Sequence, residues 1–324
     1  MAKNSVTPRC GVLVVDKPSG CTSHDVVAWA RRAFATREVG HAGTLDPMAT
    51  GVLVVLVGEA TKLSTWVTSE DKSYEAEVRF GQETDTLDAD GTITKEVDLP
   101  APDRSSIEAA ARSMVGALEQ TPPAVSAIKV GGVAAHERVR RGEVVELAPR
   151  EVVLRDVQVL TSDGPRATIA LSVSKGFYVR SFARDLAARL GTLAHLTALR
   201  RTRSGVFSVD RAMDGASLRR AREDEGARAE AHARLIPLAA LEGLVATVRV
   251  SREAAVALLK GQRPPAPEGS IEDTQLVLVD RSELALPAQP IGLAVREGDV
   301  LVARRNLLPG VILEQREPWL DGPE

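Results

Sequence analysis

The sequence predicts an α+β protein, in which strands alternate with short helices and a small β-rich domain follows at the C-terminus. Three observations predict this fold class. Residues 52–57 are an unbroken apolar run, which is typical of a strand buried on both faces. Residues 74–80 alternate between apolar and polar, as a half-buried antiparallel strand does. After Pro237 the helical pattern gives way to short β-rich segments over about 80 residues, the size of a small domain.

The first part of the chain predicts a strand, a helix, a loop and a second strand. Residues 11–15 form a short apolar strand. Ser23 is the expected N-cap of a helix that ends near Ala35. The loop of residues 41–51 leads into the buried strand, which ends at Gly58.

The middle of the chain predicts a helix, two strands and a further helix. Ser105 and Glu108 have the spacing of a capping box, which predicts a helix running to about Leu118. Residues 151–160 and 167–175 predict two strands joined by a turn. A helix from Phe182 to Leu190 follows.

The last part of the chain separates into a charged segment and a β-rich domain. Residues 213–234 are charged and rich in alanine, which predicts one helix with solvated faces. Ser251 caps a short helix that ends at Gly261. Three short strands are expected after it, at residues 276–279, 291–295 and 299–303.

Composition limits the class of protein. The chain has 324 residues, of which 44% are hydrophobic and 26% charged, as in a globular protein with a sizeable core. No apolar run approaches the roughly 18 residues of a membrane span, and the N-terminus lacks the apolar segment of a signal peptide. The two cysteines show no metal-binding spacing, and no glycine-rich nucleotide loop occurs. We expect a cytoplasmic monomer without metal, cofactor or membrane segment.

Charge is distributed unevenly along the chain. The formal net charge is −3, which argues against a general nucleic-acid binder. Residues 175–211, however, contain eight Lys or Arg and two Asp. Such a stretch is either a local phosphate-binding patch or a solvated helix face.

The candidate site centres on Asp46. Pro47 disfavours a helical backbone at Asp46, and Gly43 and Gly51 permit unusual backbone angles and close approach on either side. A rigid acid at the end of a buried strand is a common arrangement in active sites. An Asp-Pro pair near glycines is also ordinary turn chemistry, so the residue types alone leave both interpretations open.

Three blocks resemble the TruB family of tRNA pseudouridine synthases. Residues 41–51, HAGTLDPMATG, match every specified position of that family's signature. Residues 175–186, KGFYVRSFARDL, are similar to its second motif, and the resemblance continues from Leu199 to Gly205. Residues 16–23, DKPSGCTS, resemble its opening motif, and the acidic loop 84–91 also resembles a family segment.

The resemblance implies a fold and a domain division. It implies the pseudouridine synthase fold over residues 1–238, a mixed, largely antiparallel sheet flanked by helices. In this fold, residues 123–150 would be an insertion that grips tRNA. Residues 239–324 faintly resemble a PUA RNA-binding domain. Within the insertion, Val125 and His136 stand where many relatives carry tyrosine.

The resemblance also implies an activity, the conversion of a uridine in the T loop of tRNA (position 55) to pseudouridine. Asp46 would act on the flipped nucleotide, Arg180 would keep it ionised, and Tyr74 would stack on the base and help move a proton. The substrate-binding residues implied are His41, Tyr178, Leu199, Lys17, Lys62 and Lys129.

The same residue types have plainer interpretations. Lys17 and His41 are equally typical of exposed turns, Tyr178 and Leu199 of a core, and Arg180 of a surface or phosphate contact. Two other functions therefore stay open. One is a non-catalytic tRNA-binding protein or tRNA-folding chaperone on the same scaffold, and the other is a domain that binds a small ligand.

Overall fold

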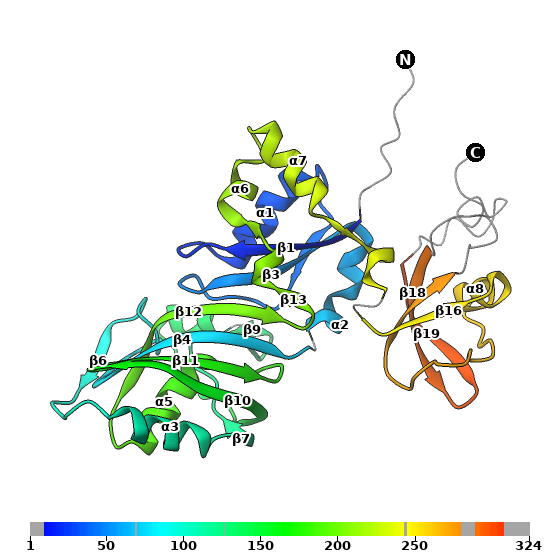
Figure 1. Cartoon of the computed structure of the whole chain (residues 1–324). Helices are drawn as coiled ribbons and strands as arrows, with labels where there is room; N and C mark the ends of the chain where they lie inside the picture. The colour runs from blue at the N-terminus through cyan, green and yellow to red at the C-terminus, as the bar shows by residue number, and fades with distance from the viewer. Residues whose placement is uncertain (1–9, 69, 127, 243–244, 280–288, 308–324) are drawn as a thin grey trace.

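The computed structural model describes residues 10–68, 70–126, 128–242, 245–279 and 289–307. Figure 1 shows a long, strongly twisted sheet with helices packed on it and a smaller β module beside one end. Both the large mixed sheet and the separate C-terminal sheet confirm the predicted α+β class. None of the helices in these residues is long and apolar enough to cross a membrane.

Within the described residues, the main sheet has eleven strands, eight of which follow the order β14-β1-β3-β12-β4-β11-β10-β7. Only the β1–β14 and β3–β12 pairs are parallel, so the sheet is mixed and largely antiparallel, as predicted. Its strands are β1 (Gly11–Lys17), β2 (Val39–Ala42), β3 (Thr50–Val57), β4 (Lys72–Phe80), β7 (Gly116–Gln120), β10 (Arg150–Asp163), β11 (Arg166–Val173), β12 (Ala194–Ser204), β13 (Phe207–Ser208), β14 (Met213–Asp214) and β15 (Ile236–Pro237).

Most of the larger helices cover one face of this sheet and share its main apolar core. They are α1 (Ser23–Ala33), α3 (Arg104–Arg112), α5 (Val179–Arg189), α6 (Gly215–Arg220) and α7 (Glu225–Ala233). The shorter elements are η1 (Gly58–Leu63), α2 (Ser64–Thr68), β5 (Gln82–Thr84), β6 (Ile93–Glu96), β8 (Lys129–Val130), β9 (Val133–Ala134), α4 (Ala135–Arg140), η2 (Val209–Arg211) and η3 (Leu238–Leu241).

Strand β3 is buried on both faces, as its apolar run predicts. Its side chains at Leu53, Val55 and Val57 join the main core with α1 and α5. The alternate side chains, from Val52 to Leu56, join a second core shared with the C-terminal sheet. A strand covered on both faces has no polar side, which explains the unbroken run of Val and Leu.

The C-terminal module has its own four-stranded sheet in the order β16-β17-β18-β19. Ser251 caps α8 (Arg252–Leu259) by accepting the Ala254 N–H, which confirms that prediction. The three predicted strands are present, and a fourth strand, β16, was not predicted. The strands are β16 (Thr247–Val250), β17 (Gln275–Val279), β18 (Gln289–Glu297) and β19 (Val300–Asn306).

Two of the predicted helices differ in the structure. Asp103, not Ser105, caps α3, because its Oδ1 accepts both the Ser106 N–H and the Ser105 hydroxyl. This helix ends at Arg112, and the residues that follow pair with β10 as β7. The single helix predicted over 213–234 is instead a short strand and two helices, α6 and α7, each with its own Asp N-cap.

Candidate active site

The loop that carries Asp46 lies between β2 and β3 and is fixed first by Ser23. Thr22 caps α1 in a capping box with Asp25, so the prediction that Ser23 is the cap was wrong. The Ser23 hydroxyl instead accepts the Leu45 N–H at 2.9 Å and contacts the Leu45 carbonyl at 3.1 Å. Ser23 thereby ties the start of α1 to the residue before Asp46.

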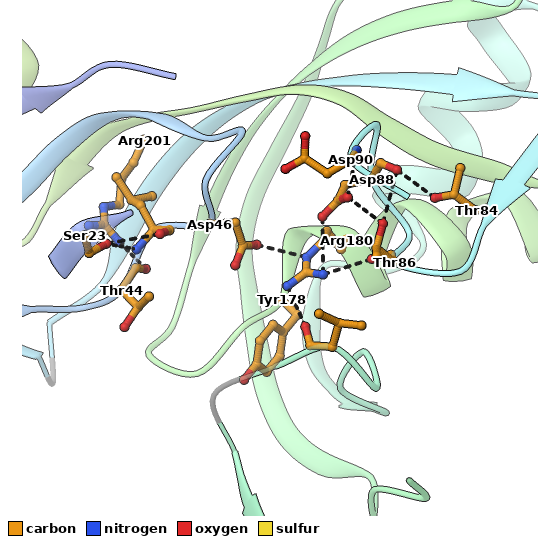
Figure 2. A network of polar contacts seen from close by, with 12 residues as sticks. Ser23, Thr44, Asp46, Thr84, Thr86, Asp88, Asp90, Tyr178, Arg180 and Arg201 are labelled. Atoms are coloured by element: carbon orange, nitrogen blue, oxygen red, sulfur yellow. Dashed lines mark hydrogen bonds and ion pairs between the residues drawn. The ribbon is translucent and has the colours of Figure 1, made fainter. Parts of the chain in front are cut away.

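A buried arginine fixes the same loop from the other side. Arg201 is 1% exposed and donates from Nε to the Val52 carbonyl at 2.7 Å. Its terminal nitrogens donate to the carbonyls of Gly43 at 2.9 Å and Thr44 at 3.4 Å. Figure 2 shows this cluster beside Asp46. The sequence did not identify Arg201, although it lies in the stretch 199–205 that continues the second motif.

Lys17 binds backbone carbonyls of the scaffold instead of making the predicted phosphate contact. Its side chain is fully buried, and Nζ donates to the carbonyls of Cys21 at 2.6 Å, Pro18 at 3.0 Å and Pro47 at 3.2 Å. Burial lowers its pKa. Because its ammonium is surrounded by backbone oxygens, the prediction that Lys17 lies at an RNA phosphate was wrong.

Asp46 forms an ion pair with Arg180, as the sequence predicted. Its Oδ2 lies 2.9 Å from the Arg180 Nε, and the two side chains are 34% and 5% exposed. Arg180 also donates to the Thr86 carbonyl at 2.9 Å and the Val125 carbonyl at 3.0 Å. These contacts orient the guanidinium group toward Asp46 (Figure 2). Val125 contributes a backbone oxygen, so the absence of tyrosine there does not remove this contact.

A second carboxylate shares the arginine. Asp88 is 4% exposed, and its Oδ2 lies 3.3 Å from the Arg180 Nη1. Its Oδ1 accepts the Thr86 hydroxyl at 2.6 Å and the Asp90 N–H at 3.1 Å. The sequence did not identify Asp88 individually, although the acidic loop that resembles the family contains it. Burial, reinforced by Asp88, raises the pKa of Asp46, whereas Arg180 opposes that rise.

Asp46 and Arg180 line an open cavity of about 860 Å³, which is large enough for a nucleotide. Tyr74 on β4 and Leu199 on β12 also line it, and both are almost completely buried. Tyr178, which directly precedes α5, contributes to the wall. The structure therefore brings these five predicted site residues to one cavity.

Another part of the cavity wall carries two groups whose pKa values are lowered. His41 packs edge-on against His24 with ring centroids 5.6 Å apart. Burial, with His24 and Arg201 nearby, lowers the pKa of His41 to about 4, so this ring is neutral at pH 7. Lys72 donates to the Thr68 carbonyl, and burial beside Arg201 lowers its pKa to about 8. The sequence did not identify Lys72.

The remaining predicted cations are Lys62 and Lys129. Lys62 pairs with Glu59 and is not among the described residues that line the cavity. The side chain of Lys129 lies outside the part of the chain that the structure describes. The basic stretch 175–211 does not form a continuous free patch, because several of its arginines have ion-pair partners. These arginines are Arg180, Arg184 and Arg200.

Comparison with solved structures shows where this fold occurs. The chain is similar to the chain in "Crystal structure of the archaeal box H/ACA sRNP Nop10-Cbf5 complex", with a TM-score of 0.70 and 20% identity over 97% of this chain and 91% of that one. A Cbf5-Nop10-Gar1 complex gives a TM-score of 0.68 and 22% identity over 94% and 87%. Both alignments extend over more than nine-tenths of this chain, so the likeness includes the C-terminal module.

Comparison of sequences gives the family. The model of the TruB family pseudouridylate synthase N-terminal domain matches residues 31–179, and that of the tRNA pseudouridylate synthase B C-terminal domain matches 180–245. The tRNA pseudouridine synthase B of Thermobifida fusca is 50% identical over 210 residues, 62% of this chain and 72% of that protein. That of Mycobacteroides abscessus is 48% identical over 221 residues, 65% and 74%.

The fold and the site together with these matches define a pseudouridine synthase, an isomerase. The chain belongs to the TruB family of these enzymes.

Proposed function

We propose that this protein converts a uridine in the T loop of tRNA, at position 55, to pseudouridine. The reaction breaks the bond between uracil N1 and ribose C1′ and forms one between C5 and C1′. A proton leaves C5, and N1 gains one. The observation that carries the proposal is the ion pair of Asp46 and Arg180 in a cavity that fits a nucleotide. The similarity to tRNA pseudouridine synthases of bacteria supports tRNA as the substrate.

Asp46 is the group proposed to act on the nucleotide. Arg180 favours its ionised form, while burial and Asp88 raise its pKa and so make the carboxylate a better base and nucleophile. Either of two steps fits this carboxylate, which can attack the nucleotide covalently or take a proton from the sugar. In both, the guanidinium of Arg180 holds the carboxylate in place.

Tyr74 and Leu199 are proposed to hold the flipped base. Removing a base from its stack costs a few kcal/mol, and stacking on an aromatic ring returns about 1–3 kcal/mol. The two side chains lie on the neighbouring strands β4 and β12 and line the same cavity as Asp46. His41, whose ring is neutral at pH 7, and Tyr178 also line the cavity and are proposed to contact the nucleotide and its neighbours.

The other parts of the chain are assigned to RNA binding. Residues 1–238 would form the catalytic domain, with residues 123–150 gripping the T loop. Residues 239–324 would be a PUA-like domain that contacts the rest of the tRNA. We propose that the enzyme acts as a monomer, because the described residues of one chain supply the groups of the Asp46 site. We also propose that it is cytoplasmic, because its bacterial relatives are tRNA pseudouridine synthases.

Release of tritium from C5-labelled uridine in a T-loop hairpin tests the activity. A matched hairpin, whose only labelled uridine lies outside the position-55 site, controls for position. We expect release from the first RNA alone. Asp46→Asn should abolish release and leave the dissociation constant for tRNA within about threefold, because the amide is isosteric but neither basic nor nucleophilic.

Other results would favour the alternative functions. Binding without release by the unmodified protein would indicate a non-catalytic tRNA-binding protein or chaperone. Absence of salt-dependent tRNA binding at two salt concentrations would instead favour a small-ligand domain. Full turnover by Asp46→Asn would remove Asp46 from its proposed role.

A further inference from the structure

Tyr178 occupies an unusual position at the start of α5. It is the N-cap residue of the helix whose first turn carries Arg180, yet its side chain makes no capping hydrogen bond to the described residues. Tyrosine is not among the residues that favour N-caps. Its backbone N–H donates instead to the Oε1 of Gln120 at 2.7 Å, and Gln120 is completely buried. Gln120, at the end of β7, therefore positions the start of α5.

Arg150 holds the side chain of the same tyrosine. Its guanidinium carbon lies 4.6 Å from the centre of the Tyr178 ring, which is a cation–π contact. Its Nη2 also donates to the carbonyl of Gly176. Gly176 has a φ of +81°, so the turn before α5 needs glycine at this position. One arginine thus contacts both the turn and the ring that follows it.

The two contacts come from a single backbone pair. Arg150 begins β10 and Gln120 ends β7, and they lie opposite each other in the antiparallel ladder. The insertion of residues 123–150 leaves the sheet after Gln120 and returns at Arg150. Beside this pair, the Thr121 carbonyl accepts the Ser181 hydroxyl at 2.8 Å. Gln120, Thr121 and Arg150 therefore fasten the base of the insertion to the beginning of α5.

We propose that Arg150 is a positioning residue that, together with Gln120, fixes Tyr178 and through it the α5 turn that presents Arg180 to Asp46. The proposal rests on the proposed function, in which the insertion grips the RNA. The strand pair at the base of the insertion then links RNA docking to alignment of the ion pair. Arg150 lines the cavity, so the competing role is a direct phosphate contact. The position of its guanidinium group over the Tyr178 ring favours positioning.

Single-turnover kinetics with the T-loop hairpin separate these roles. For Arg150→Met we expect the rate at saturating RNA to fall about 10- to 100-fold, because misplacement of catalytic groups by about 1 Å has effects of that size. The dissociation constant and its salt dependence should stay within about twofold. Arg150→Lys should not restore the rate, because an ammonium group has no planar face to stack on the ring. Arg155→Met on the same strand, which removes an exposed pair with Asp71, should leave the rate unchanged.

A spectroscopic measurement tests the same point without relying on activity. The chain has only two tyrosines, so labelling with ¹⁵N-tyrosine gives two amide signals, those of Tyr74 and Tyr178. In Arg150→Met the Tyr178 signal should shift and its amide should exchange at least about tenfold faster, as expected when a local fastening is lost. The Tyr74 signal serves as the internal control and should not change, which also shows that the variant is folded.

The results that would overturn the proposal are distinct. An unchanged rate with weaker binding and a smaller salt dependence would make Arg150 a phosphate contact. Full rescue by Arg150→Lys would show that charge alone matters, and an unchanged Tyr178 amide would remove the positioning role. In a Tyr178→Leu background, Arg150→Met should cause no further loss of rate, and an additive loss would contradict action through Tyr178. If the unmodified enzyme released no tritium, the proposed T-loop activity would fail, whereas the amide measurement would still decide the role of Arg150.

Discussion

Gly51→Ala should weaken both the fold and the catalytic loop, because Gly51 is where β3 meets β12. Gly51 has a φ of +98°, a conformation that L side chains rarely adopt. A Cβ added there would lie 2.1 Å from the carbonyl oxygen of Arg201. The strands are joined at this point by only two residue pairs, Arg200 with Thr50 and Arg201 with Gly51. Relief of the clash must therefore move Arg201 relative to the loop that it holds.

The size of the effect follows from two contributions. Left-handed backbone at a residue other than glycine costs about 1–3 kcal/mol. The overlap must be relieved by a shift of roughly 1 Å or more, and such overpacking typically costs a further 1–3 kcal/mol. The free energy of unfolding should therefore fall by about 2–6 kcal/mol. A displacement of that size at the Asp46 loop should also lower the single-turnover rate about 100-fold.

Gly116→Ala is a matched control for Gly51→Ala. Gly116 has a φ of +116°, and no heavy atom of the described residues lies within 4 Å of an added Cβ. It should show the strain alone, a loss of about 1–3 kcal/mol in urea denaturation, with an unchanged rate for the folded enzyme. If Gly51→Ala matched Gly116→Ala in both unfolding free energy and rate, the contact between Gly51 and Arg201 would have no role in holding the loop.

Three further predictions concern the same site. In Arg180→Gln the acid limb of the pH–rate profile should move to higher pH, because the pKa of Asp46 rises further when its cation is removed. Arg180→Lys keeps a cation and should move the acid limb less. Acid limbs that coincide with that of the unmodified enzyme would contradict this. Ser23→Ala should lower the unfolding free energy by about 1–2 kcal/mol and lower kcat without changing KM, because it releases Leu45; a change in KM alone would argue against it. His41 binds a proton more weakly in the folded state (pKa about 4) than when unfolded (6.5), so its contribution to stability is lost as pH falls from about 6.5 to 4. Between pH 7 and pH 4.5 the free energy of unfolding of His41→Gln should therefore fall by about 2 kcal/mol less than that of the unmodified enzyme, a figure that allows for the partial exposure of His41. Equal falls in the two proteins would refute this.

The sequence by itself determined the fold class, several of the strands and the central carboxylate. Periodicity identified β3 and β4. A strand buried on both faces, like β3, has a continuous apolar sequence, and a strand buried on one face, like β4, has alternating apolar and polar residues. The motif around Asp46 was identified because the resemblance spans many fixed positions. Arg180 was identified as its partner in the same way, and the ion pair is present.

Only the tertiary structure decided which polar groups serve the site and which serve the scaffold. Nothing in the local sequence distinguishes Lys17 and Arg201 from exposed lysines and arginines. Both are nevertheless buried and donate hydrogen bonds to backbone carbonyls of other segments. Thr22 caps α1 in place of the predicted Ser23, and the Ser23 hydroxyl accepts the N–H of Leu45, 22 residues later. A polar side chain is satisfied by whichever partner folding brings within about 3 Å, and local sequence does not record which distant partner that will be.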